Sequence, residues 1–287
     1  MRIPRLKVSL AVALVVAGVA AAVAIGAPTR AAGLTPNQQA VMQAFDKTSK
    51  LPSLRFAFVL GLSGGVTGKN GYTLTGSGGA DLVHQSSAFT LNLGALASLL
   101  GGATGGATIP SSVPVVVTGG VAYVHAPSVA TQIQAGAEWI KFTSAAIPSS
   151  VSSLVNPKAL SSVTPQKVIA ATSVHRVGKA SVRGTSTTHY TVTVAVAKLP
   201  AGLSKAGKTV GVSSAQLQVY VDGAGYVRRV SSTLAHVKFQ KGAAGSSLRF
   251  QVDLFDFGAP VTVTKPPASK TVSGDALVKQ LLGGAGG

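Results

Sequence analysis

Carboxylate pairs are the first chemistry to look for, because two acids held close together can act as general acid and base. The chain has only seven acidic residues, and they are dispersed. Asp253 and Asp256 are the one close pair, and on a strand their odd spacing turns the side chains to opposite faces. We therefore predict surface roles for all the acidic residues and no catalytic pair.

A serine nucleophile is the second candidate. Gly61-Leu62-Ser63-Gly64-Gly65 matches the G-x-S-x-G nucleophile elbow, in which a strand precedes the serine and a helix follows it. Here a strand precedes, but Thr67 to Tyr72 is typical of a turn into another strand. Gly is also abundant, at 34 of 287 residues, so the match is weak evidence. We interpret the segment as a tight hairpin turn and expect no enzyme.

Metal and redox sites are not expected either. The absence of cysteine removes thiol nucleophiles, cysteine metal sites and redox pairs. The histidines form no H-x-H or H-x-x-x-H pair, and no phosphate-binding or dinucleotide-binding loop is present. We therefore predict no metal and no cofactor. The five histidines are His84, His125, His175, His189 and His236.

The elements that would position any site are mostly β-strands, since apolar residues alternate with period two from Leu54 onward. Gly119-Gly120 and Asp222 to Gly225 are turn signals between strands. The predicted strands cover Leu54 to Leu62, Tyr72 to Val83, Ala88 to Leu93, Val113 to Val117, Gly120 to His125, Glu138 to Phe142, Thr188 to Ala197, Leu217 to Val221, Tyr226 to Phe239 and Leu248 to Phe257.

Helix signals are few. Thr35 is a good N-cap before Pro36, which predicts a helix to about Lys50. Gly94 to Ser112 suggests a flexible flap or a short apolar helix, and Ala145 to Ala171 suggests helical turns. Ser273 to Leu282 is typical of a capped helix.

These elements predict an α+β fold: a single strongly curved antiparallel β-sheet, a half-barrel, with helices packed on its concave face. We expect one domain over residues 34–287. Aromatic residues are few (nine Phe, five Tyr, one Trp), so the inward side chains are small. Such a surface fills space poorly and leaves room for a cavity.

The N-terminal segment, residues 1–33, has the layout of a secretory signal. Arg2, Arg5 and Lys7 precede an apolar run from Val8 to Ala27, and small residues follow. The run is long enough for an uncleaved membrane anchor as the alternative. Either way we predict an extracytoplasmic location, secreted or in the cell envelope.

The rest of the chain is basic. Beyond the leader it carries 21 basic and seven acidic residues, a net charge of +14. This excess favours contact with an anionic membrane surface or wall polymer, although the charges are scattered and also serve solubility. Export and the scarcity of aromatic residues argue against nucleic acid.

An ordered set of short segments resembles the LppX/LprG-type cell-envelope lipoproteins of actinobacteria, which are structural relatives of the LolA lipoprotein carrier. The segments are Val121-Ala122-Tyr123-Val124, Glu138-Trp139-Ile140-Lys141, Val182-Arg183-Gly184-Thr185-Ser186-Thr187-Thr188-His189-Tyr190, Gln218-Val219-Tyr220-Val221-Asp222, Gly225-Tyr226-Val227-Arg228-Arg229-Val230, Phe255-Asp256-Phe257-Gly258-Ala259-Pro260-Val261 and Pro266-Pro267.

The resemblance implies a LolA-like half-barrel whose apolar cavity holds the acyl chains of an envelope lipid or glycolipid. The protein would carry this lipid between membrane and wall. We expect it to be a monomer. The chain departs from the family in lacking the lipobox cysteine. The residues we expect to line the cavity are apolar side chains of the alternating strands and the flap: Phe56, Phe58, Leu91, Leu93, Leu96, Leu99, Leu100, Tyr123, Trp139, Val192, Val194, Leu217 and Val219.

Two other functions stay open. An exported scaffold or regulatory protein would bind a protein or an anionic polymer, would have no ligand cavity and would be sensitive to salt. A hydrolase using Ser63 ranks last.

Overall fold

The computed structural model of the protein describes residues 33–64, 71–94, 110–143, 172–195, 212–237 and 245–275. Residues 1–32 of the predicted leader, most of the flap, the helical turns of residues 145–171 and most of the C-terminal helix lie outside these ranges. Among the described residues, no helix has the length and apolar character needed to cross a membrane.

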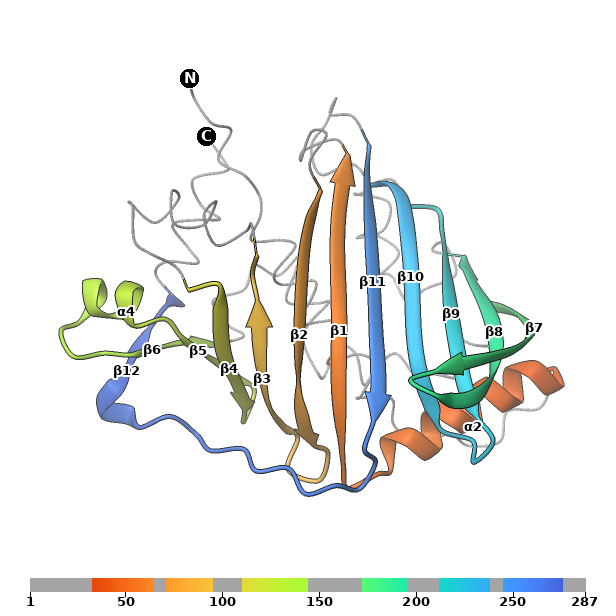
Figure 1. Cartoon of the computed structure of the whole chain (residues 1–287), viewed down its shortest axis with the longest axis horizontal. Coiled ribbons are helices and arrows are strands. Elements are labelled where there is room, and N and C mark those ends of the chain that lie inside the picture. The colour runs from red at the N-terminus through yellow and green to blue at the C-terminus, as the bar shows by residue number, and fades with distance from the viewer. Residues whose placement is uncertain are drawn as a thin grey trace.

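The described strands form one sheet of twelve, in the order β12-β6-β5-β4-β3-β2-β1-β11-β10-β9-β8-β7 (Figure 1). Neighbouring strands are antiparallel except for β12, which runs parallel to β6. Within the described residues the sheet is open, because β12 and β7 lie at its two edges. The strands are β1 (Ser53–Gly64), β2 (Tyr72–Asp81), β3 (Ser86–Asn92), β4 (Ser112–Thr118), β5 (Val121–His125), β6 (Trp139–Thr143), β7 (Thr172–Val182), β8 (Thr185–Ala195), β9 (Ser214–Asp222), β10 (Val227–Val237), β11 (Ser246–Phe255) and β12 (Thr271–Ser273).

The sequence prediction of a single, mostly antiparallel sheet is confirmed. All ten predicted strands are present as β1 to β6 and β8 to β11, with their ends shifted by a few residues. Both predicted turns are also present: Thr118 pairs with Val121 across Gly119-Gly120, and the Gly225 N–H donates to the Asp222 carbonyl at 3.0 Å.

Two strands and one helix were not predicted. Strand β7 is an edge strand that carries exposed polar residues, and its register shifts between Arg176 and Gly178, where Val177 is 60% exposed. Such an edge lacks the apolar alternation that predicts strands. Strand β12 (Thr271–Ser273) ends at Ser273, where the predicted C-terminal helix starts, and helix α4 (Pro127–Ile133) is short.

The register places apolar side chains on one face of the sheet from edge to edge. We call this the apolar face and define it by Phe56, Phe58 and Val252; the opposite face, with Arg229, Gln251 and Asp253, is the polar face. One row of directly paired positions on the apolar face runs across eight strands: Val272, Ile140, Val124, Val115, Phe89, Gly78, Phe56 and Leu254.

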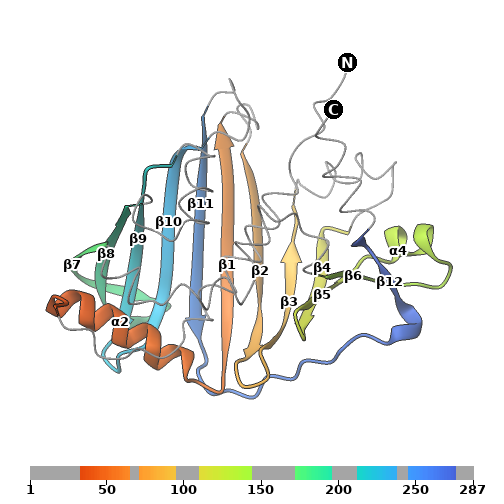
Figure 2. The ribbon, with the colours of Figure 1, turned by 180° about the vertical axis from the view of Figure 1, so that it is seen from behind.

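The two described helices pack near opposite ends of the apolar face. Val41 and Ala44 of α2 (Pro36–Ser49) join the core cluster that includes Val219 and Val227, and Figure 2 shows α2 crossing the strands at the β7–β10 end. At the other end Ala130 of α4 packs with Ile140 and Val272. Helices lining the concave side of the whole sheet, as predicted, are not confirmed: the described helices lie only at its two ends.

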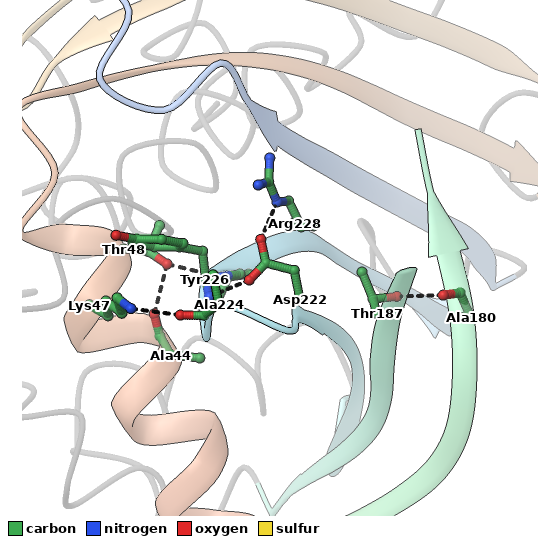
Figure 3. Close-up of polar contacts among 10 residues, drawn as sticks. Ala44, Lys47, Thr48, Ala180, Thr187, Asp222, Ala224, Tyr226 and Arg228 are labelled. Carbon is green, nitrogen blue, oxygen red and sulfur yellow. Dashed lines mark hydrogen bonds and ion pairs between the residues drawn. The ribbon is translucent and has the colours of Figure 1, made fainter. Parts of the chain in front are cut away.

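Helix α2 begins and ends where its sequence signals predict. Thr35 and Gln38 form a capping box, in which the Thr35 hydroxyl accepts from the Gln38 N–H at 3.3 Å and the Gln38 side chain accepts from the Thr35 N–H at 2.8 Å. Near the other end, the Thr48 hydroxyl accepts from the buried Val227 N–H at 2.9 Å and Lys47 donates to the Ala224 carbonyl at 2.6 Å (Figure 3). Polar contacts therefore fix the helix on the β9–β10 turn.

The middle of the apolar face is built from phenylalanine rings lying against glycine backbone. A Cβ atom at Gly76 would lie 2.6 Å from Phe58 Cε1, and one at Gly78 would lie 2.5 Å from Phe89 Cα. The Phe58 and Phe89 rings meet at 6.1 Å between centroids, and Phe56 packs on Phe89 at 5.8 Å. The glycines of β2 thus allow three rings to pack where ordinary side chains would collide.

Candidate functional site

Most of the predicted cavity residues lie together on the apolar face. Phe56, Phe58 and Leu91 belong to one buried core cluster. The same cluster contains Leu93, Val192, Val194 and Val219, and Leu217 packs against it while only partly buried. The structure therefore brings these eight side chains onto one surface that spans β3, β1, β9 and β8.

Two predicted residues lie on the other face. Val124 is the β5 residue that faces the core, and it pairs with Ile140. Tyr123 and Trp139 are each one position away, so the pleat turns both to the polar face, where the Trp139 ring lies 4.8 Å from His125. The structure thus separates these two aromatic residues from the apolar face. Leu96, Leu99 and Leu100 lie outside the described residues.

The register identifies further apolar side chains that the sequence analysis did not name for this surface. Val113 and Val115 of β4 and Val252 of β11 are all buried in the same cluster. Their alternation was visible in the sequence. Their assignment to this face required the strand order, which places β11 directly beside β1.

Each carboxylate has a polar partner of its own. All seven acidic residues lie in the described ranges, and each has its own partner, so no two carboxylates share a site. The pairs are Asp46 with Lys50, Asp81 with His84, Glu138 with Lys270, Asp222 with Arg228, Asp253 with Arg229, Asp256 with Arg55, and Asp275 with the Thr143 N–H and hydroxyl.

The prediction that every acidic residue is exposed was wrong for Asp222 and Asp253, which are 8% and 7% exposed. Arg229 donates to Asp253 through Nε at 2.6 Å and through Nη2 at 2.7 Å. These hydrogen bonds raise the pKa of Arg229 above its usual value, so the guanidinium stays charged. At Asp81, hydrogen bonds from the His84 backbone N–H and then from its ring lower the pKa of the carboxyl.

Catalytic geometry is not found at the serine motif. Ser63 lies within β1, where it pairs with Ser247 of β11, and its side chain is exposed. The next described element is strand β2, whereas a nucleophile elbow needs a helix after the serine. Among the described residues, no group of three His, Asp or Glu side chains is placed to hold a metal ion.

The apolar face can therefore interact with a ligand by burying apolar surface area. A surface of Phe, Leu and Val side chains can hold an apolar molecule by excluding water, at about 25 cal/mol per Å² of apolar area buried. Acyl chains are ligands that have such apolar area to bury.

Comparisons with known proteins give structural similarity alone. No family model and no curated protein matches the chain. LppX, a lipoprotein of Mycobacterium tuberculosis, is 17% identical with a TM-score of 0.47, over 79% of this chain and 98% of LppX. LprF of Mycobacterium bovis is 12% identical with a TM-score of 0.44, over 81% and 97%. A LolA superfamily protein of Nitrosomonas europaea is 9% identical with a TM-score of 0.29, over 82% and 97%.

LppX, LprF and a LolA superfamily protein, the kinds of protein that the sequence segments resemble, are among the solved structures that the chain is similar to.

Proposed function

We propose that this chain is an exported, non-catalytic binding protein. It holds the acyl chains of an envelope lipid or glycolipid against the apolar face of its sheet and carries the lipid between membrane and wall. Residues 1–33 direct its export or anchor it, and residues 34–287 form the binding domain.

One observation carries the proposal: within the described residues, a single open sheet carries apolar side chains along one face, and helices pack only near its two ends. The central strands contribute the Phe56, Phe58 and Phe89 rings, and the partly buried Leu60, Phe250 and Leu217 border them. An acyl chain buries area along such a surface without needing a charged partner.

Affinity in this proposal depends on chain length. Each CH₂ group that is buried adds up to about 0.8 kcal/mol, which is about a 3- to 4-fold decrease in Kd. We expect methyl esters from eight to sixteen carbons, competing with the neutral dye Nile red, to bind progressively more tightly, with little effect of salt.

Adjacent positions on β9 provide a matched pair of variants. Leu217→Ala removes apolar area from the apolar face and is expected to weaken ester binding several-fold. Gln216→Ala changes an exposed residue on the polar face and is expected to leave binding unchanged. Affinity that does not vary with chain length, or salt-sensitive binding of a polyanion only, would favour the scaffold function instead.

A further inference from the structure

Ser232 of β10 is a polar residue in the middle of the apolar face. It pairs with Phe250 of β11 on one side and with Leu217 of β9 on the other. Two positions before it, Val230 belongs to the main core cluster, and two positions after it, Leu234 packs against a second cluster. The hydroxyl thus lies among apolar side chains, where the two clusters meet.

The Ser232 hydroxyl is buried, and no hydrogen bond joins it to the described residues. The residue is 3% exposed, and its Oγ has no hydrogen-bond partner among the described residues. Other buried hydroxyls are satisfied within the protein: Ser53 donates to the Ala259 carbonyl at 2.6 Å, and Thr187 donates to the Ala180 carbonyl at 3.1 Å (Figure 3). A buried polar group without a partner is costly, and an alanine here would avoid that cost.

We propose that the Ser232 hydroxyl is the polar contact for the bound lipid and donates a hydrogen bond to an ester or amide carbonyl oxygen of its acyl chain. This inference rests on the proposed function and deepens it, because it assigns a polar atom of the ligand to one position on the sheet. The ligand class is then an esterified or amidated acyl chain, held with its carbonyl level with β10.

The surroundings of Ser232 favour a neutral acceptor. Its cross-strand neighbours Phe250 and Leu217 are apolar. Arg229 of β10 and Asp253 of β11 pair with each other on the polar face. An ionised carboxylate would be buried there without a counterion, which is unfavourable. An ester or amide carbonyl accepts a hydrogen bond without bringing a charge.

The test compares two probes of similar length, methyl laurate and tetradecane, by displacement of Nile red from the full chain. Wild type and Ser232→Ala are measured in parallel, with Ser231→Ala as the control, because Ser231 lies on the same strand but pairs with Gln251 on the polar face. The ratio of the two dissociation constants cancels changes in general apolar packing.

We expect Ser232→Ala to weaken ester binding relative to alkane binding by roughly 3- to 10-fold, the effect of one neutral hydrogen bond. Ser231→Ala should leave the ratio unchanged. In urea unfolding without ligand, Ser232→Ala should be at least as stable as wild type, because a hydroxyl without a partner has been removed.

Two results overturn the inference while leaving the proposed function intact. One is a ratio that Ser232→Ala does not change although both probes bind. The other is a ligand-free Ser232→Ala variant less stable than wild type, which would mean that the hydroxyl has a partner within the protein. If neither probe binds wild type, the proposed function itself fails.

Discussion

Arg229 and Asp253 form a bidentate ion pair on the polar face, with Asp253 almost fully buried. Removing one partner of such a pair leaves an uncompensated charge. We expect Arg229→Met to lower the free energy of unfolding by about 3 kcal/mol, measured by urea denaturation followed by circular dichroism.

A double variant separates the pair from the packing around it. Arg229→Met with Asp253→Leu removes both charges, and we expect it to regain most of the lost stability. Arg249→Met, on the same face but exposed, should change stability by less than about 0.5 kcal/mol. A single Arg229→Met variant as stable as wild type would contradict this account of the polar face.

Single residues show how far the sequence could predict the site. Alternation alone predicted that Phe56, Phe58 and Val219 are core residues, because apolar residues recur at every second position of their strands. Tyr123 and Trp139 were predicted from residue type, and the pleat places them opposite the apolar face. Asp253 was predicted as a surface acid because its partner Arg229 lies on another strand, and pairing between strands is not visible in a single sequence.

The glycines of β2 are the structural feature on which the centre of the apolar face depends. A Cβ atom at Gly78 would collide with the Ala88 carbonyl and lie 2.5 Å from Phe89 Cα. Backbone atoms cannot rotate away as a flexible side chain can. We therefore expect Gly78→Ala to destabilise the protein by roughly 1–3 kcal/mol, the range for overpacked cores, in the same urea assay.

Ser77→Ala is the control, since Ser77 is the preceding residue of β2 and is exposed on the other face. Its effect should stay within about 0.5 kcal/mol. Equal stability of the Gly78→Ala and Ser77→Ala variants would contradict the close approach of β3 to β2 at this point.

Elements with a repeating apolar signal were predictable, and the others were not. Strand β8 has valine at alternate positions and was predicted within a few residues. Strand β7 carries His175, Arg176 and Lys179. It lies at the edge of the sheet that the described residues form, and apolar alternation is not required of an edge strand. The parallel pairing of β12 with β6 joins distant parts of the chain and has no local signal.

The strands of the described residues form one layer, and this arrangement underlies the proposed function. Two stacked sheets would bury their apolar faces against each other. Within the described residues a single sheet of twelve strands carries one apolar face, and Asp253 pairs with Arg229 on the other face. The order of the strands in the sheet could not be predicted from the sequence. The long run of alternating segments did predict a single sheet.

The most direct measurement is native mass spectrometry of the chain purified from the extracytoplasmic fraction, followed by organic extraction. The account predicts a native mass above that of the polypeptide. The excess should disappear on extraction, and the extract should contain acylated molecules. A native mass equal to that of the polypeptide alone, unchanged after incubation with acyl lipids, would contradict the claim that the apolar face holds a lipid.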